Sequence, residues 1–363
     1  MSASRLGRLQ SLLRDNDLDA LVVTHPPNIR YLTGLSASAG AAVVGRDRCV
    51  LRVDFRYATA ARTAADTTPG VDVEVFTGSI DAAISAGLSL LNARSIGVEA
   101  EHMAVAGFNR LLASMDGEKD HAPTLVPTER LVERLRVIKD AEEVAILREA
   151  GRRISRVGRR LRAFAVPGRS ELEVAAAIDS AMRTAGFQRP AFDTIVASGP
   201  NGALPHARPT DRTLLAGEGV VLDFGGVYDG YCVDLTRTLQ LGRVPARFRR
   251  MFDAVRDAQA AGIAAVRPGA RAIDIDGAAR AVLDARGLGE AFGHGTGHGL
   301  GLEVHEEPRL SKLAPAEEVV SAGMVFTIEP GAYVAGVGGV RIEDDVLVVS
   351  GGCELLTDVP VQL

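Results

Sequence analysis

Two aspartates, Asp223 and Asp234, lie on either side of a predicted tight turn. The segment VVLDFGGVYDGYCVDLTRT (220–238) is rich in strand-forming residues on both sides of Asp229-Gly230, and Asp-Gly between two such runs is typical of a β-hairpin. With Asp229-Gly230 as the loop, Gly225 faces Asp234, and Asp223 lies diagonal to Asp234. A loop one residue earlier would place the two aspartates directly opposite. Either register points both carboxylates the same way, about 5–8 Å apart at the backbone.

Two carboxylates held this close repel each other unless a cation lies between them. Divalent ions prefer such hard oxygen ligands. Exposed aspartates on a hairpin surface are the alternative, because exposed Asp is common. The first strand, however, is apolar on both faces around Val221, Leu222 and Phe224, which predicts burial, and a buried carboxylate must be paired or bound to metal.

Three histidines lie in the glycine-rich segment FGHGTGHGLGLEVHEEP (292–308), namely His294, His298 and His305. The alternating glycines argue against a helix and predict a loop whose backbone approaches a ligand closely. A satisfied core or surface histidine is the alternative for any single one of the three. No phosphate-binding glycine motif is present in the segment.

Glu329 and Glu343 each lie within a predicted apolar strand, in MVFTIEPGAYV (324–334) and GGVRIEDDVLVV (338–349). An acid inside such a run suggests pairing or metal ligation, although Asp344 and Asp345 would fit a solvated strand end. Four carboxylates and an imidazole exceed the needs of one ion and suit a two-metal cluster. Such a cluster activates water and polarises a carbonyl, so the pattern predicts metal-assisted hydrolysis.

The elements that must position these residues form two groups. Residues 1–130 alternate between helix and strand, with a helix from Ser4 to Asn16, as expected for an α/β domain. Residues 131–165 have a helical apolar stripe and are predicted to form a long helical connector, and a capping box at Ser170 and Glu173 begins the next helix. The remaining predicted elements are strands at 18–24, 41–45, 48–54, 71–76, 95–101, 192–199, 219–226, 231–239, 324–334 and 340–349, and helices at 57–65, 246–266 and 271–285.

Composition excludes several classes of protein. The chain has 363 residues, a net charge of −5 and three cysteines. This length favours two domains, and the charge gives no electrostatic support for a nucleic-acid partner. No CxxC pair indicates a thiolate zinc site. Neither a signal peptide nor a membrane span is expected, so the predicted location is the cytoplasm.

The motifs together resemble the aminopeptidase P and prolidase family of pita-bread metallopeptidases. The resemblance rests on motifs in family order: NIRYLTGL (28–35), FDTIVASG (192–199), PHA (205–207), the hairpin segment, HGTGHGLGLEVHE (294–306), FTIEPGAY (326–333) and VRIEDDVLV (340–348). It implies a creatinase/prolidase-like α/β N-terminal domain, residues 1–130, followed by an α+β pita-bread catalytic domain, residues 131–363. It also implies a dimer or a larger homo-oligomer.

The resemblance implies a role for each matching position. Asp223 would be a two-oxygen ligand of one metal, and Asp234 and Glu343 would bridge both metals. His298 and Glu329 would bind the other metal, and Glu329 would also serve as general base or proton shuttle. His305 and His206 would contact the substrate around the scissile carbonyl, while His294 and Arg341 would help to bind substrate and transfer protons. The expected cofactor is two divalent ions, manganese first, with cobalt or zinc as alternatives.

The implied activity is hydrolysis of a peptide bond before proline. RVDFRYATAA (52–61) is similar to a segment of small aminopeptidases P, which favours removal of the first residue from Xaa-Pro peptides. An Xaa-Pro dipeptidase (prolidase) is the alternative. A non-catalytic binding protein on the same fold is the alternative from a different class. Such proteins have lost metal ligands, whereas all five ligand positions are filled here.

Overall fold

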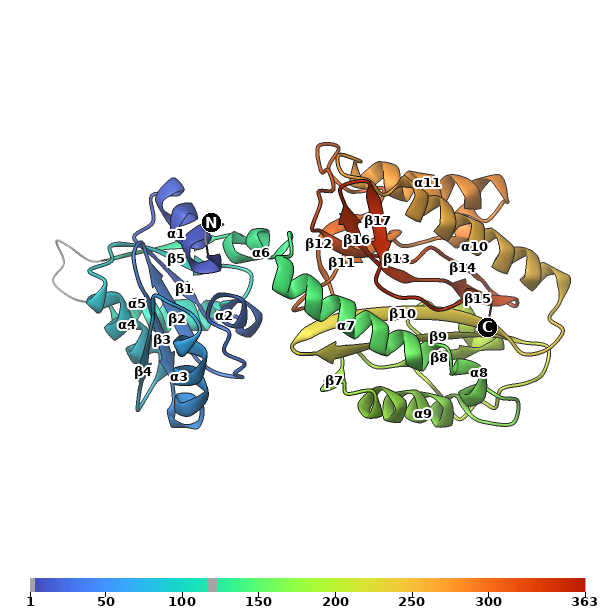
Figure 1. Cartoon of the computed structure of the whole chain (residues 1–363), viewed down its shortest axis with the longest axis horizontal. Coiled ribbons are helices and arrows are strands. Elements are labelled where there is room, and N and C mark those ends of the chain that lie inside the picture. Colours follow the sequence, from blue (N-terminus) through green and yellow to red (C-terminus); the bar gives the residue numbers. More distant parts are fainter. Residues whose placement is uncertain (1–3, 116–122, 363) are drawn as a thin grey trace. The chain divides into compact units, whose positions relative to one another are not determined.

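The computed structural model describes residues 4–115 and 123–362, and the chain forms two compact units, Met1–Arg136 and Val137–Leu363 (Figure 1). The boundary between the units falls within the predicted helical connector. No helix in the described ranges is long and apolar enough to cross a membrane.

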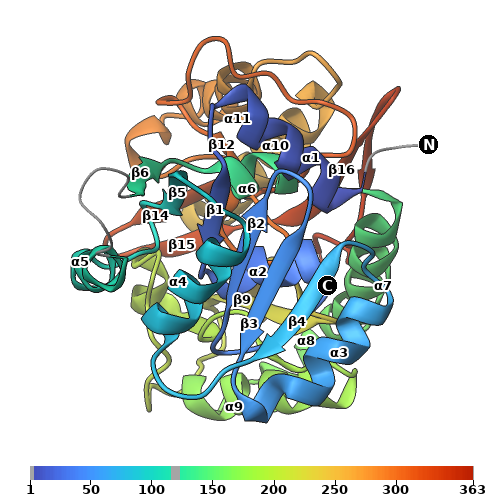
Figure 2. The same ribbon diagram turned by 90° about the vertical axis from the view of Figure 1, so that its left-hand side faces the viewer.

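The N-terminal unit is built on one mixed six-stranded sheet with the order β4-β3-β2-β1-β5-β6 (Figure 2). Only β2 runs antiparallel to its neighbours within this sheet. Its four central strands, β3, β2, β1 and β5, are largely buried and rich in Val, Ala and Leu, as expected when helices cover a sheet. The strands are β1 (Ala20–Val23), β2 (Ala41–Gly45), β3 (Cys49–Val53), β4 (Val71–Val75), β5 (Ser95–Glu99) and β6 (Thr124–Thr128).

The helices of this unit follow the predicted alternation with the strands. The first helix begins after Ser4, because the Ser4 side chain caps it by accepting a hydrogen bond from the Gly7 amide. The helices are α1 (Arg5–Asp15), α2 (Pro26–Thr33), α3 (Ala58–Asp66), α4 (Ile80–Leu90), α5 (Val105–Ser114) and α6 (Leu131–Arg136), with a 3₁₀ turn, η1 (Phe55–Tyr57), before α3.

The single connector helix predicted at 131–165 is wrong. It is three helices: α6, then α7 (Ala141–Gly158), then α8 (Leu161–Phe164). The break occurs because Asp140 caps α7, and its side chain and that of Glu143 form a complete capping box. The apolar stripe of α7 packs along β10, so this helix is a wall of the second unit rather than a free linker.

The second unit contains a four-stranded sheet whose centre is the predicted hairpin, β9 (Gly219–Tyr228) and β10 (Tyr231–Gln240). Two short strands, β7 (Arg189–Pro190) and β8 (Ile195–Ser198), pair with β9. Helix α9 (Glu171–Thr184) contacts β8 and begins at the predicted Ser170 capping box. The strand predicted at 192–199 is observed only over β8, and a 3₁₀ turn, η2 (Gly199–Ala203), follows it.

A second, five-stranded sheet has the order β12-β11-β13-β16-β17. A two-stranded ribbon, β14-β15, lies between β13 and β16 in the sequence. Two predicted helices, α10 (Ala246–Ala265) and α11 (Ala272–Ala285), are confirmed and pack on each other. The strands are β11 (Gly297–Gly299), β12 (Glu306–Leu310), β13 (Val325–Ile328), β14 (Gly331–Val334), β15 (Gly338–Arg341), β16 (Asp344–Val349) and β17 (Gly352–Leu355).

The last two predicted strands are each interrupted once, and each interruption carries a glutamate. The strand predicted at 324–334 divides into β13 and β14 around Glu329-Pro330, and that at 340–349 divides into β15 and β16 around Glu343. At each break the chain passes between the five-stranded sheet and the β14-β15 ribbon. Each glutamate therefore lies between two strands and not within either of them. The terminal strand β17 was not predicted.

Candidate metal centre

The β9–β10 hairpin fixes the relation of the two aspartates. Asp234 pairs with Gly225, and Asp223 pairs with Thr236, so the Asp229-Gly230 loop register is confirmed and the alternative register is excluded. Asp223 is 8% exposed and Asp234 is 5% exposed. The interpretation of these residues as surface acids is therefore wrong, because both strands are buried along nearly their whole length.

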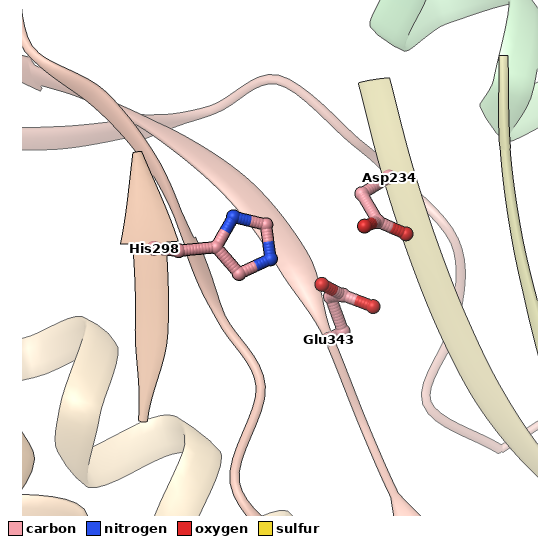
Figure 3. A group of neighbouring side chains, drawn as sticks. All are labelled: Asp234, His298 and Glu343. Carbon is pink, nitrogen blue, oxygen red and sulfur yellow. The ribbon is translucent and has the colours of Figure 1, made fainter. Parts of the chain in front are cut away.

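Asp234, His298 and Glu343 converge from three separate elements (Figure 3). Each offers one ligand atom, and these atoms all lie within 4.8 Å of one another. Figure 3 shows the imidazole of His298 and the two carboxylates pointing toward a common space. One divalent ion could contact all three after small side-chain adjustments, since metal–ligand distances are about 2.0–2.2 Å.

Glu329 and Asp223 complete the predicted ligand set around the same space. Glu329 Oε1 lies 3.5 Å from His298 Nε2. Asp223 lies outside the group of three, and Arg341 Nη2 donates a hydrogen bond of 2.5 Å to its Oδ2. All nine predicted site residues line one cavity of about 520 Å³: His206, Asp223, Asp234, His294, His298, His305, Glu329, Arg341 and Glu343.

Buried carboxylate oxygens without hydrogen-bond partners test whether this cavity fits a metal ion. Asp223 Oδ1, Asp234 Oδ1 and Glu343 Oε1 are buried and accept no hydrogen bond among the described residues. An orphaned buried carboxylate oxygen is costly, whereas a hard divalent cation satisfies several at once. The residues therefore fit a metal site, and mixed carboxylate and imidazole donors suit manganese, cobalt or zinc.

The electrostatics of the metal-free site point the same way. Burial, followed by the charge of Glu343, raises the pKa of Asp234 well above its usual value. Burial also raises the pKa of Glu343, with Glu329 as the next cause, and it raises the pKa of Glu329 to about 8. Without a cation these acids hold protons, because several negative charges cannot share one buried space.

His298 is held in the neutral form that a metal requires. Burial, and then the neighbouring His305, lowers the pKa of His298 to about 3. Its Nδ1 lies 3.1 Å from the Gly299 carbonyl oxygen. With the proton on Nδ1, the Nε2 lone pair is available toward the carboxylates, and such an outer hydrogen bond is typical of metal-binding histidines.

The acids next to the predicted ligands are also buried. Asp344 is 4% exposed and Asp345 is 0% exposed, so the expected solvated strand end is wrong. Asp344 forms an ion pair with the buried Arg237, and Asp345 accepts a hydrogen bond from the Asp234 backbone amide. Thr236 Oγ1 donates to Glu343 Oε2 at 2.6 Å. These contacts help to orient the predicted ligands Asp234 and Glu343, as groups hydrogen-bonded to ligands do in metal sites.

The three outer histidines have different environments. His305 is more exposed, and its ring lies edge-on to that of His298 with centroids 4.4 Å apart. Burial lowers the pKa of His294 to about 4, and its Nε2 is 2.9 Å from the Tyr333 hydroxyl. His206 is exposed at the cavity wall. The three histidines are therefore available to a bound molecule at different depths.

Sequence reasoning missed Tyr333 and Arg309. The Tyr333 hydroxyl accepts a hydrogen bond of 2.8 Å from Arg341 Nη1 and so links Arg341 to His294. Arg309 lines the cavity. The sequence offered no signal for Arg309, because it follows the segment predicted as a loop, whereas the structure places it in β12.

Two glycines of the histidine segment lie against the backbone of neighbouring strands. A Cβ on Gly297 would lie 1.9 Å from the Thr327 carbonyl oxygen, and one on Gly299 would lie 2.1 Å from that of Glu307. The approach of this backbone to a ligand stays a prediction, and Gly295 and Gly297 line the cavity. Small residues let β11 fit between β12 and β13, and this close fit holds His298 in the cavity.

Comparisons with known proteins agree with this geometry. Residues 145–350 match the metallopeptidase family M24, and residues 5–138 match the creatinase/prolidase N-terminal domain. The Xaa-Pro dipeptidase of Pyrococcus furiosus is 33% identical over 97% of each chain. The structure of the Xaa-Pro dipeptidase from Bacillus anthracis has a TM-score of 0.93, 34% identity and coverage of 99% of this chain and 98% of that one. The X-Pro aminopeptidase from Thermotoga maritima has a TM-score of 0.87, 29% identity and coverage of 98% and 99%.

The fold and the acidic cavity define a metal-dependent hydrolase. The chain belongs to metallopeptidase family M24, with a creatinase/prolidase N-terminal domain before the catalytic unit. The predicted fold class, an α/β domain followed by an α+β pita-bread unit, is confirmed, as is the prediction of a metallopeptidase.

Proposed function

We propose that this enzyme hydrolyses the bond between a first residue and proline, using two divalent ions held by Asp223, Asp234, His298, Glu329 and Glu343. One observation carries the proposal: three buried carboxylate oxygens without partners face one cavity together with a neutral imidazole. The names of the Xaa-Pro relatives support the proline specificity.

The metal ions would supply an activated water and would polarise the scissile carbonyl. The chain's own groups bind and move protons around it. Glu329, which lines the cavity with its Oε1 3.5 Å from His298 Nε2, is suited to accept a proton from that water and return it to the leaving nitrogen. Burial lowers the pKa of His305, so its neutral imidazole can donate a hydrogen bond to the developing oxyanion. Arg341 holds both Asp223 and Tyr333 in place.

Chelation tests the metal part of the proposal. Removing metal should abolish hydrolysis of Gly-Pro-Gly, and manganese or cobalt should restore it. Gly-Ala-Gly should be cut far more slowly by the restored enzyme. Full activity of a sample shown by elemental analysis to be metal-free would refute the metal assignment, and equal rates on the two peptides would refute the proline specificity.

The residues that line the cavity favour a dipeptidase over an aminopeptidase. This differs from the sequence similarity of residues 52–61, which favours an aminopeptidase. Two arginines, Arg208 and Arg309, line the cavity, and neither has an ion pair with an acid among the described residues. In an Xaa-Pro dipeptide, the proline that follows the scissile bond is the last residue and carries the free carboxylate. An arginine beside the site can pair with that carboxylate, whereas a longer peptide has a neutral amide at that position.

The two specificities are separated by comparing Gly-Pro with Gly-Pro-Gly on the manganese-loaded enzyme. A dipeptidase should prefer Gly-Pro, and Arg309→Met should raise KM for Gly-Pro by about tenfold or more, as expected when a charged partner is lost. A wild-type preference for Gly-Pro-Gly that Arg309→Met leaves unchanged would instead support the aminopeptidase.

Location and assembly belong to the same proposal. We propose a cytoplasmic enzyme that acts as a homodimer or larger homo-oligomer, on the basis of the family resemblance. Sedimentation of the manganese-loaded enzyme tests the assembly, because a monomer at assay concentration would contradict it.

A further inference from the structure

Glu171 is a fully buried carboxylate that does not line the active-site cavity. It is the first residue of α9, and its side chain is 0% exposed. Its Oε1 accepts hydrogen bonds of 2.7 Å from both the amide and the hydroxyl of Ser198. Its Oε2 accepts from the amide of Thr210 at 3.0 Å and from the Thr210 hydroxyl at 2.7 Å. The Asn201 side chain lies 3.1 Å from both oxygens.

These donors are the two ends of one segment, residues 198–210. The middle of the same segment, 205–209, forms part of the cavity wall and carries His206 and Arg208. Both side chains are exposed, so few packing contacts hold them. A single carboxylate thus joins the beginning and the end of the wall segment at its base.

Further contacts strengthen this base but leave Glu171 at its centre. The Glu171 amide donates to the Arg212 carbonyl at 3.0 Å, and the Leu172 amide donates to that of Thr210 at 3.1 Å. The first turn of a helix has such unpaired amides, and here the end of the wall segment and the residues directly after it satisfy them. Arg212 Nη1 also donates to the Ser198 hydroxyl at 2.6 Å.

On the cavity side the segment has a second attachment. Arg341 Nη1 donates to the Pro205 carbonyl at 3.3 Å, and Gly202 packs backbone to backbone against Gly339. The wall is therefore held at its base by Glu171 and near its tip by a residue of the site itself. Loss of the Glu171 carboxylate would leave the backbone hydrogen bonds at the base and these two contacts near the tip to place His206 and Arg208.

We propose that Glu171 is a positioning residue for peptide hydrolysis, which fixes the wall segment so that His206 and Arg208 meet the substrate. The proposal rests on the proposed function for its kinetic consequences, but its structural part does not. Hydrogen bonds to a buried charge are among the stronger ones, and a neutral replacement leaves several donors unpaired.

Glu171→Gln is the first test, because it keeps the shape and removes the charge. Glu173→Gln is the matched control, since Glu173 lies in the same helix turn but is exposed, and its carboxylate accepts from the Ser170 amide at 2.7 Å. Amide hydrogen exchange in residues 199–212 should speed up by about tenfold or more in Glu171→Gln and stay unchanged in the control. Metal content should be equal in all three proteins.

A double-mutant cycle with His206→Ala tests whether Glu171 acts through the wall. Glu171→Gln should lower kcat/KM for the Xaa-Pro substrate by about 10–100-fold in the wild-type background, but much less when His206 is already absent. Additive losses would mean a general structural role and would overturn the proposal.

Thr210→Val keeps the proposal testable if Glu171→Gln does not fold. It removes one of the donors from the wall side while α9 stays intact, and it should speed exchange in the same segment. Unchanged exchange in the folded variants would overturn the proposal. If the wild-type enzyme cut no Xaa-Pro peptide, the proposed function would fail, and hydrogen exchange alone would still decide whether Glu171 holds the wall.

Discussion

His298 and His305 lie seven residues apart in one glycine-rich segment, but the structure gives them different surroundings. His298 is 6% exposed, is part of β11 and has its ligand atom within 4.8 Å of two carboxylates. His305 is exposed and lies outside that group of ligand atoms. The same residue type can therefore bind metal at one position and substrate at the other.

Substituting each histidine by alanine should separate these roles. His298→Ala removes a nitrogen ligand, so metal content and activity should fall together, although the carboxylates can retain part of the metal. His305→Ala should leave metal content and stability unchanged and should lower kcat about 10²–10³-fold, as when one transition-state hydrogen-bond donor is lost. Elemental analysis and steady-state kinetics on both variants check this.

The reverse pattern would contradict the assignment of the segment. If His305→Ala lost its metal while His298→Ala kept it, the two roles would have to be exchanged. A loss of folded protein in either variant is measured separately by thermal unfolding, so that it is not mistaken for loss of metal.

At the scale of the element, the fit of β11 between its neighbours depends on glycine. Gly297→Ala should destabilise the enzyme by about 1–3 kcal/mol, because its Cβ would meet the Thr327 carbonyl, a backbone group that cannot swing aside. The strand must shift to relieve this clash, so His298 moves and metal content should fall as well. Urea unfolding and elemental analysis measure the two effects.

Gly293→Ala is the control from the same segment. A Cβ there would have no neighbour within 4 Å, so stability and metal content should match the wild type. Equal losses in the two variants would mean that the segment is sensitive to any added side chain, not to the approach of β11 to β13.

The elements that could be predicted are those whose signals are local. Asp229-Gly230 with strand-forming residues on both sides predicted the hairpin and offered its correct register, and Ser170 with Glu173 predicted the start of α9. The breaks at Glu329 and Glu343 were missed because both lie inside apolar runs that read as continuous strands. Their cause is tertiary: the chain leaves one sheet for another at each glutamate.

The same distinction holds for the site. The nine side chains predicted from residue types, spacing and the family resemblance all line one cavity. The role of Glu171 could not be predicted, because its partners Ser198, Asn201 and Thr210 are 27 to 39 positions away. The burial of Asp344 could not be predicted either, since its partner Arg237 lies on a different sheet.

At the scale of the whole molecule, the buried acids link folding to metal and pH. In the metal-free enzyme, burial raises the pKa values of Asp234, Glu343 and Asp345 well above those of free acids, and that of Glu329 to about 8. The folded state therefore holds protons that the unfolded state has already released. Stability from these groups is present at low pH and is lost as pH rises through the folded-state pKa.

The buried histidines act in a lower pH range with the opposite sign. The pKa of His298 is lowered to about 3 and that of His294 to about 4, from an ordinary 6.5. The unfolded state binds protons at these positions below pH 6.5 and the folded state does not, so their contribution increases as pH rises toward 6.5. Above pH 6.5 the histidine effect is complete, and the acids alone set the slope.

We therefore expect the metal-free enzyme to lose stability between pH 6.5 and 8, by about 1.4 kcal/mol per pH unit for each proton still held. Bound manganese should reverse this trend, because it takes the place of the protons and binds more tightly once they have left. Calorimetric melting of the catalytic unit at pH 6.5, 7.2 and 8, with chelator and with saturating manganese, should give a Tm difference that widens with pH. Glu329→Gln has no proton to release in this range, so its metal-free Tm should depend less on pH. A metal-free wild-type Tm that rises from pH 6.5 to 8 would show that the carboxylates are already ionised without metal, and that the cavity tolerates their charges by some other means.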